Sequence, residues 1–244
     1  MKTLPILVDF DNLDSSFVRS GVLSLSRSLV SIIPTDVLEQ YNSISVRLYG
    51  GWRCQGALTI GAQRLIPEIR ANSPATVGNP RSPLMRPLRL SVELAETLIG
   101  TTAPLTETLV RDRDLRKFRF KNNASKCSGA GVGCGFNVYV NTSYSSQCPT
   151  MGCSARLGEF FVRDEQKMVD TLLVADIAAY VMHRNIRDLV VVSSDADMWP
   201  GVLLAMNSGC NVVQVHPRSN WRTQRHLLDT IRMTRSAKYF QTSF

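Results

Sequence analysis

The chain has 244 residues, enough for one large domain or two small ones whose core needs no disulfides. Apolar residues make up 44% and charged residues 20%, a composition that excludes a disordered or fibrous protein. Lysine and arginine number 28 against 20 acidic residues, and the net charge of +8 favours a polyanionic partner such as nucleic acid. The sequence lacks both an apolar run of roughly 18 residues and a secretory signal, so we expect a cytoplasmic protein that is not bound to a membrane.

Short apolar runs alternate with helical patterns along most of the chain. Strands are predicted where apolar residues run together or alternate, at 4–9, 44–49, 88–94, 188–194 and 211–216. Helices are predicted where apolar residues recur at helical spacing, at 14–33, 57–70, 165–184, 198–209 and 222–233. Four prolines predict a long loop at 72–90. Strands that alternate with helices predict an α/β fold with a parallel sheet.

The middle of the chain breaks this alternation. Residues 111–126 hold seven Lys or Arg against two Asp, and residues 127–153 are rich in Gly, Ser and Cys. We therefore predict a domain in two parts, at 1–110 and 158–244, separated by a basic and Cys-rich insertion at 111–157. The second part ends in a basic C-terminal segment.

Acidic residues follow two of the predicted strands and begin one helix. Asp9 and Asp11 come after the first strand, Asp195 and Asp197 come after the strand at 188–194, and Asp170 lies in the first turns of the helix at 165–184. Ligands of an open parallel sheet bind beyond the carboxyl ends of its strands. Clustered carboxylates repel one another and need a cation, and oxygen ligands select Mg²⁺ or Mn²⁺. Each Asp alone is equally well explained as a helix cap or a solvated loop residue, and only their joint placement favours a metal site.

Three motifs, in this order, resemble those of NYN-domain proteins, a branch of the PIN-like ribonuclease superfamily. They are VDFDN at 8–12, QKMVDTLLVAD at 166–176 and VVVSSDADMWP at 190–200. The resemblance covers residues 1–70 and 158–217 and leaves 72–157 uncovered. Two positions depart from the family pattern, because Met168 and Ser194 stand where members commonly have glycine.

The resemblance implies a three-layer, Rossmann-like (PIN-like) parallel sheet and metal-dependent hydrolysis of RNA phosphodiester bonds. Carried over by position, Asp9, Asp170 and Asp195 form the acidic core that binds Mg²⁺ or Mn²⁺. Asp11 and Asp197 are then secondary ligands or groups that position water.

Two further residues of these motifs are implied to act in catalysis. Asn12 orients Asp9 or the metal-bound water, and Lys167 meets the scissile phosphate or balances the acids. A solvated helix lysine is an equally good interpretation of Lys167. Asp176 lies six positions beyond Asp170 and does not share its helix face, so we interpret it as structural.

Four cysteines lie within 27 residues of the insertion, at Cys127, Cys134, Cys148 and Cys153. Four thiolates form closed tetrahedral zinc sites, and we predict that a structural Zn²⁺ folds the insertion. The spacings of six and four intervening residues at the two ends of the cluster are wider than the usual tight pairs. Free or redox-active thiols and disulfides therefore remain alternatives.

Basic and aromatic residues that suit single-stranded nucleic acid occur in two segments. The first is the predicted strand LRKFRFK, in which Phe118 and Phe120 are equally well explained as core residues. The second is the segment RSNWRTQRH. The predicted contacts are Arg113, Arg116, Lys117, Arg119, Lys121, Arg218, Trp221, Arg222 and Arg225.

Two other functions compete with the ribonuclease. A haloacid-dehalogenase-like phosphatase has an Asp-x-Asp nucleophile motif on its first strand, as in DFDN, but Asn12 departs from its pattern and the motif around Lys167 stays unexplained. A non-catalytic RNA-binding protein would gain nothing from carboxylates that repel the backbone. The sequence leaves open DNA as a substrate, endo- or exonucleolytic attack, and the oligomeric state.

Overall fold

The computed structural model describes residues 2–78, 86–112, 163–166, 168–232, 234 and 236–244. The chain forms two compact units, Met1–Leu109 with Gln166–Phe244, and Val110–Glu165. Strands β7 (Leu109–Asp112) and β8 (Arg163–Gln166) pair with each other. The cysteine cluster, Lys167 and the predicted nucleic-acid contacts between positions 113 and 121 lie outside the described residues.

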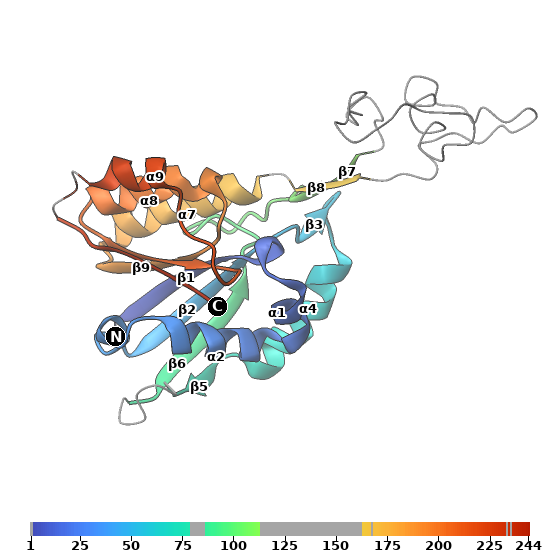
Figure 1. Cartoon of the computed structure of the whole chain (residues 1–244). Coiled ribbons are helices and arrows are strands. Elements are labelled where there is room, and N and C mark those ends of the chain that lie inside the picture. The colour runs from blue at the N-terminus through green and yellow to red at the C-terminus, as the bar shows by residue number, and fades with distance from the viewer. Residues whose placement is uncertain (1, 79–85, 113–162, 167, 233, 235) are drawn as a thin grey trace, which may run out of the picture. The chain divides into compact units, whose positions relative to one another are not determined.

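The first unit is built on a seven-stranded sheet in the order β11-β10-β9-β1-β2-β6-β5 (Figure 1). Neighbouring strands are parallel, except that β5 runs antiparallel to β6 at one edge. The strands are β1 (Thr3–Asp9), β2 (Ser43–Tyr49), β5 (Ala75–Val77), β6 (Leu88–Leu94), β9 (Asp188–Val192), β10 (Asn211–His216) and β11 (Tyr239–Ser243). A small hairpin, β3 (Arg53–Cys54) with β4 (Ala57–Leu58), follows β2.

Helices cover both faces of the sheet and make the fold three-layered (Figure 1). One face carries α1 (Ser15–Ser20), α2 (Val22–Ile32) and α4 (Ile60–Asn72), and the other carries α7 (Val169–Arg184), α8 (Trp199–Asn207) and α9 (Arg225–Ile231). The short helices are η1 (Phe10–Asn12), α3 (Thr35–Leu38) and η3 (Ala196–Met198). The α/β fold with a mostly parallel sheet, predicted from the sequence, is confirmed. None of the described helices is long and apolar enough to cross a membrane.

The central strands are buried on both faces because their side chains alternate between two cores. In β1, Ile6 and Val8 pack in the core beneath α2 and α4, whereas Leu7 packs in the core beneath α7 and α8. In β9, Val190 and Val191 divide in the same way. This burial explains why the central strands have nearly continuous apolar sequences.

Several elements differ from the sequence predictions; for example, the helix predicted at 165–184 begins only at Val169, after strand β8. The helix predicted at 14–33 is two helices, because Gly21 adopts a φ of 87° and the N–H of Val22 then donates to the Glu68 carboxylate. The loop predicted at 72–90 contains β5, and β11 was not predicted. The sequence of β11, YFQTS, is half-buried at the sheet edge and lacks the apolar run that identified the central strands.

A buried ion pair joins α7 to the sheet. Asp176 on α7 is fully buried, and its Oδ2 accepts hydrogen bonds from Arg47 Nε at 2.9 Å and from the Tyr49 hydroxyl at 2.7 Å. Its Oδ1 accepts from the backbone N–H of Ile99 at 2.8 Å. Arg47 also bonds Glu93 and the carbonyl oxygen of Thr97. Asp176 is therefore structural, and its contacts connect α7, β2 and the segment after β6.

We expect Asp176→Ala to lower the free energy of unfolding by about 3–5 kcal/mol, because it leaves the buried Arg47 charge without its main partner. The matched control is Asp229→Ala, which breaks an exposed pair with Arg232 and should cost at most about 1 kcal/mol. Urea denaturation of both variants measures the difference. Equal losses would contradict a structural role for the buried pair.

Candidate metal centre

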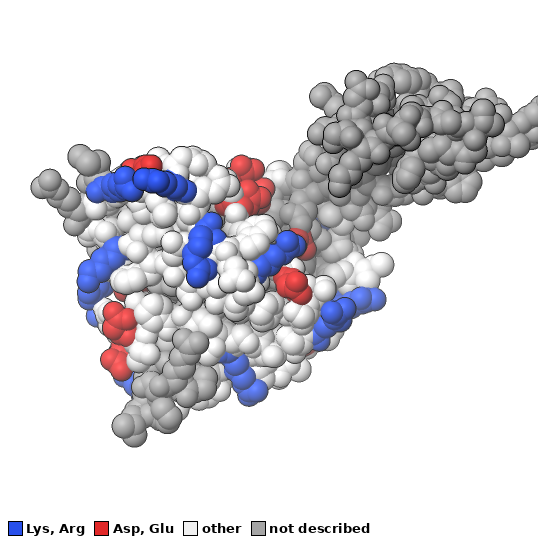
Figure 2. Space-filling model, viewed as in Figure 1, with Lys and Arg blue, Asp and Glu red and all other residues white. Residues whose placement is uncertain are grey.

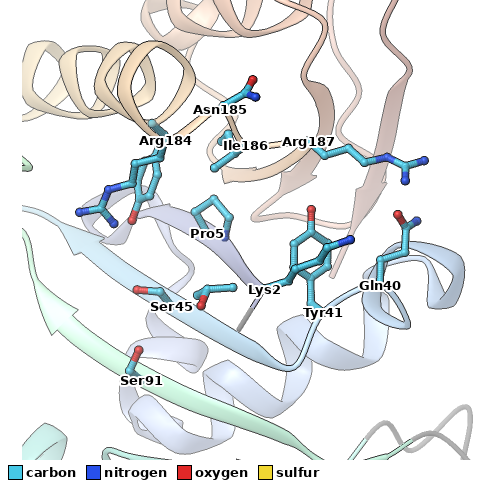
Figure 3. A pocket seen from close by; sticks show the side chains of 12 residues that line it. Lys2, Pro5, Gln40, Tyr41, Ser45, Ser91, Arg184, Asn185, Ile186 and Arg187 are labelled. Carbon is cyan, nitrogen blue, oxygen red and sulfur yellow. The ribbon is translucent and has the colours of Figure 1, made fainter.

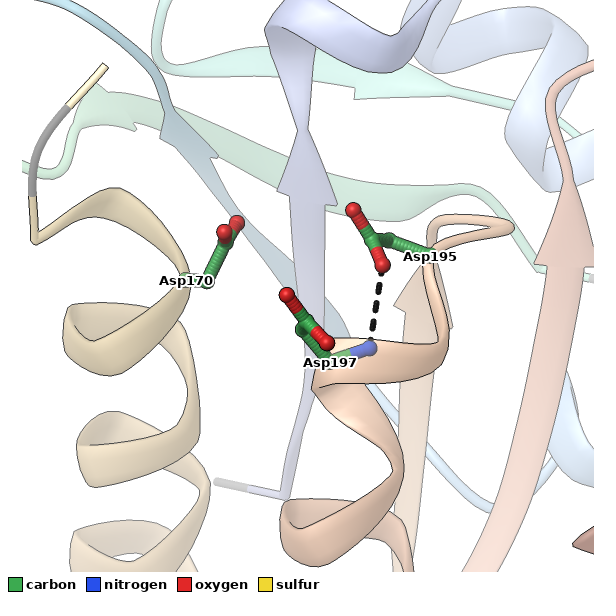
Figure 4. Close-up of side chains that lie close together, drawn as sticks. All are labelled: Asp170, Asp195 and Asp197. Atoms are coloured by element: carbon green, nitrogen blue, oxygen red, sulfur yellow. Dashed lines mark hydrogen bonds between the residues drawn. The ribbon is translucent and has the colours of Figure 1, made fainter.

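Three carboxylates converge beyond the carboxyl ends of the central strands (Figure 4). One oxygen each from Asp170, Asp195 and Asp197 lies within 4.8 Å of the other two. Asp170 comes from the first turn of α7, whereas Asp195 and Asp197 come from the segment between β9 and α8. Asp170 is half-buried, and Asp197 is exposed to solvent. We call these three residues the Asp triad.

The backbone fixes the two triad members that follow β9. Asp195 is the N-cap of η3, and its Oδ1 accepts a hydrogen bond from the N–H of Asp197 at 3.0 Å. The capping role weighed for these acids is thus real, but it falls to Asp195 rather than to Asp197. This hydrogen bond occupies one carboxylate oxygen of Asp195 and holds Asp197 next to Asp195.

Asp9 lies at the end of β1 and is only 4% exposed. Its Oδ2 accepts hydrogen bonds from Asn12 Nδ2 at 3.1 Å and from the Ser193 hydroxyl at 2.9 Å. The Ser193 hydroxyl in turn accepts from the N–H of Asp195 at 3.0 Å. Asp9 is outside the Asp triad, and the Asn12 amide holds one of its oxygens by a hydrogen bond. Through Ser193, Asp9 is linked to the segment that carries Asp195.

Asp11 is tied to a different segment. Its Oδ2 accepts from the backbone N–H of Gly51 at 2.8 Å, in the turn that follows β2. A Cβ atom on Gly50 would lie 2.9 Å from the same oxygen and 2.8 Å from the Trp52 ring, so a larger residue there would displace one of these side chains. Asp11 therefore joins the ends of β1 and β2 at the site.

Electrostatic repulsion within the site is visible in two pKa values. Burial, and then the charges of Asp9, Asp195 and Asp197, raise the pKa of Asp170 from 3.8 to about 6. Burial also raises the pKa of Asp9, against the hydrogen bonds from Asn12 and Ser193, which lower it. Burial is the largest cause of both shifts, and a bound cation would offset the smaller part that comes from neighbouring carboxylates.

The raised pKa of Asp170 predicts a pH-dependent stability for the protein in EDTA. Between pH 4 and 6 the unfolded chain ionises Asp170 while the folded protein keeps it protonated, so the wild type loses stability as the pH rises through this window. Asp170→Asn removes the loss, and we expect it to be more stable than the wild type by about 1 kcal/mol at pH 7, a figure reduced for solvent screening. Thermal unfolding at pH 4 and 7 measures this, with the exposed Asp36→Asn as control. A stability difference that does not grow between these pH values would contradict the prediction.

Met168 precedes α7 in a left-handed conformation, with φ 64° and ψ −5°. This is one of the two positions where the resembled family commonly has glycine, and the positive φ supplies a physical reason for that preference. Ser194, the other position, has no positive φ. Its hydroxyl instead lies 2.9 Å from Nδ1 of His216.

We expect Met168→Gly to raise the free energy of unfolding by up to about 1 kcal/mol, because glycine relieves the left-handed strain. The control is Met182→Gly, the same exchange at an exposed position inside α7, which should lower stability by about 1 kcal/mol. Urea denaturation of both variants gives the two signs. Destabilisation by Met168→Gly would show that the methionine makes a contact that outweighs its strain.

Sequence reasoning missed Ser193 and His216. His216 is buried at the end of β10, between the Ser194 hydroxyl and Thr223 Oγ1, which lies 3.3 Å from Nε2. Burial lowers the pKa of His216, so the imidazole is neutral at pH 7. Ser193 is visible in the sequence only as the first residue of SSDAD. Its pairing with Asp9 depends on the sheet order, which places β9 next to β1.

A pocket of about 490 Å³ lies at the same sheet edge, formed by the segments that follow β1, β10 and β11. It is lined by Phe17, Arg218, Trp221 and Phe244, among others. Trp221 is 44% exposed, and the Arg218 guanidinium lies 5.1 Å from its ring centroid. Arg222 and Arg225 are exposed nearby in the chain. On the face seen in Figure 2, Lys and Arg form separate groups with uncharged surface between them.

Compared with known proteins, the chain matches no family model, no curated protein and no solved structure. The fold and the Asp triad are therefore established from the chain's own geometry. The family resemblance rests on the three sequence motifs alone.

Proposed function

We propose that the protein is a metal-dependent nuclease that hydrolyses phosphodiester bonds of RNA, in the manner of NYN-domain ribonucleases. The observation that carries the proposal is the Asp triad, in which carboxylates from two distant parts of the chain lie within 4.8 Å of one another. The three sequence motifs supply RNA as the substrate, since the Asp triad alone does not distinguish RNA from DNA.

The donor set fits a hard divalent cation. All three groups offer carboxylate oxygen, the ligand type that Mg²⁺ and Mn²⁺ prefer, and no cysteine or histidine belongs to this group in the described part of the chain. Burial is the main cause of the raised pKa of Asp170, and such a cation would offset the further part that comes from the charges of Asp9, Asp195 and Asp197. Bound there, the cation would polarise a phosphoryl oxygen and favour ionisation of a water molecule.

The protein's own residues would then hold this arrangement in place. Asp195 is held by the hydrogen bond that its Oδ1 accepts from the N–H of Asp197. The buried Asp9 accepts its hydrogen bonds from Asn12 and Ser193 on Oδ2. Oδ1 of Asp9 would then be the oxygen that accepts a hydrogen bond or a proton from the attacking water. Site geometry held by buried hydrogen bonds reduces the reorganisation needed during the reaction.

The aromatic pocket supports a single-stranded substrate. Trp221 and Phe17 present ring surface for base stacking, and Arg218 carries a charge for phosphate contact. These groups and the Asp triad belong to the same edge of the sheet, where a strand of nucleic acid would meet both. Duplex RNA lacks unstacked bases for such a pocket, so we propose unpaired RNA, as a single strand or in a loop, as the substrate.

Asp195→Asn tests the activity. The amide oxygen keeps the acceptor for the N–H of Asp197, so the local fold survives while one metal ligand charge is lost. We expect cleavage of end-labelled single-stranded RNA in Mn²⁺ to fall by about 100-fold or more, and EDTA to abolish it in the wild type. Asp36→Asn, an exposed change on α3, should leave the rate unchanged.

The outcomes separate the competing functions. Equal cleavage by the wild type and Asp195→Asn would refute the nuclease proposal. Release of inorganic phosphate from a phosphomonoester without chain scission would favour the phosphatase. RNA binding without cleavage in either Mg²⁺ or Mn²⁺ would favour the non-catalytic binder.

A further inference from the structure

A second pocket lies at the amino ends of the central strands, opposite to the end that carries the Asp triad. It encloses about 450 Å³ between the C-terminal end of α7 and the first residues of β1 and β2. This volume is in the range of small-molecule sites, about 300–1,000 Å³. The seven residues of β1 separate it from the Asp triad by about 20 Å, at roughly 3.3 Å per residue.

The pocket lining carries three cations and no carboxylate. Lys2, Arg184 and Arg187 line it, and among the described residues none of the three forms an ion pair. Figure 3 shows Arg184 and Arg187 on either side of Ile186, and Lys2 beside Tyr41. The nearby carboxylate of Asp188 is buried behind the lining, where it accepts a hydrogen bond from the Tyr41 hydroxyl. The charge on the lining itself is therefore positive and attracts an anion.

The rest of the lining combines serine hydroxyls from strands β2 and β6 with two apolar residues. Ser45 on β2 is half-buried, and its hydroxyl makes no hydrogen bond within the described part of the chain. Ser91 on the neighbouring strand β6 also lines the pocket (Figure 3). Pro5 and Ile186 provide apolar surface. Hydroxyls suit phosphate oxygens, and the apolar residues suit a ring.

Part of the charge has another explanation. Cations stabilise the C-terminal end of a helix, and Arg184 is the last residue of α7, with its guanidinium 5.2 Å from the ring centroid of Tyr180. That effect accounts for Arg184 alone. Lys2 precedes β1 and Arg187 precedes β9, so neither is in the helix, yet both line the same pocket.

We propose that this pocket binds a phosphate-bearing ligand of nucleotide size, with Lys2 and Arg187 as its principal phosphate contacts. The ligand is either a free nucleotide or one nucleotide of an RNA strand, because both present the same phosphate and ring. The inference is independent of the Asp triad and of catalysis there.

Calorimetric titration of the full chain with adenosine diphosphate tests the site, in EDTA so that no cation bridges phosphate to the Asp triad. We expect the wild type to bind and the double variant Lys2→Ala/Arg187→Ala to bind at least tenfold more weakly. The charge-keeping variant Lys2→Arg/Arg187→Lys should retain binding. Arg27→Ala/Arg64→Ala removes two exposed charges elsewhere and should change the affinity less than twofold.

Absence of binding up to about 1 mM, or equal weakening in both alanine double variants, would overturn the proposal. If a short single-stranded RNA displaces the nucleotide from the wild type, and the Lys2→Ala/Arg187→Ala variant no longer binds that RNA, the proposal is supported and the pocket is assigned to backbone phosphates. Binding of the nucleotide without such competition would support it and assign the pocket to free nucleotides. Asp195→Asn should bind the nucleotide as the wild type does, so failure of the nuclease proposal leaves this result unaffected.

Discussion

The buried pair between Arg47 and Asp176 fixes the geometry on which the candidate site depends. Asp170 lies beside the other triad members only while α7 keeps its position over the sheet. Asp176 lies six residues further along the same helix, about 9 Å along its axis at 1.5 Å per residue. Its three hydrogen bonds come from two side chains of β2 and one backbone N–H, so α7 cannot slide or rotate without leaving buried charge unpaired. Such a pair contributes little net stability but defines position.

On this fixed frame, the site gathers negative charge that the described residues around it do not neutralise. The hydrogen bonds from Asn12 and Ser193 stabilise ionised Asp9, and the cap on Asp195 stabilises that carboxylate. No hydrogen bond among the described residues supports Asp170, whose pKa is raised to about 6 by burial and then by the neighbouring carboxylates. A purely structural cluster would be expected to place hydrogen-bond donors around its most perturbed member. The arrangement instead leaves repulsion that a divalent cation would relieve, which is the physical reason for proposing a metal centre.

Much of this frame could be predicted from the sequence, because buried parallel strands have apolar sequences that helical segments do not share. The strand predicted at 88–94 coincides with β6, and the acids that follow β1 and β9 meet at one edge because these strands are neighbours. Ser193 and His216 could not be predicted, since their partners depend on which strands pair. Strand β11 was not predicted because a half-buried strand at the sheet edge does not need a run of apolar residues. The insertion remains a prediction.

Opposite charges lie at the two ends of the parallel strands, and helix α7 runs from one end to the other. Asp170 lies in the first turn of α7, at the acidic edge, and Arg184 ends the helix beside the cationic pocket. Carboxylates near a helix N-terminus and cations near its C-terminus both have favourable interactions with the helix dipole, so this polarity costs the fold little. Because Asp176 ties the helix to β2 between the two ends, we expect a ligand at one end of the helix to leave the other end in place. The cationic pocket is therefore better explained as a second binding site than as a means of regulating the first.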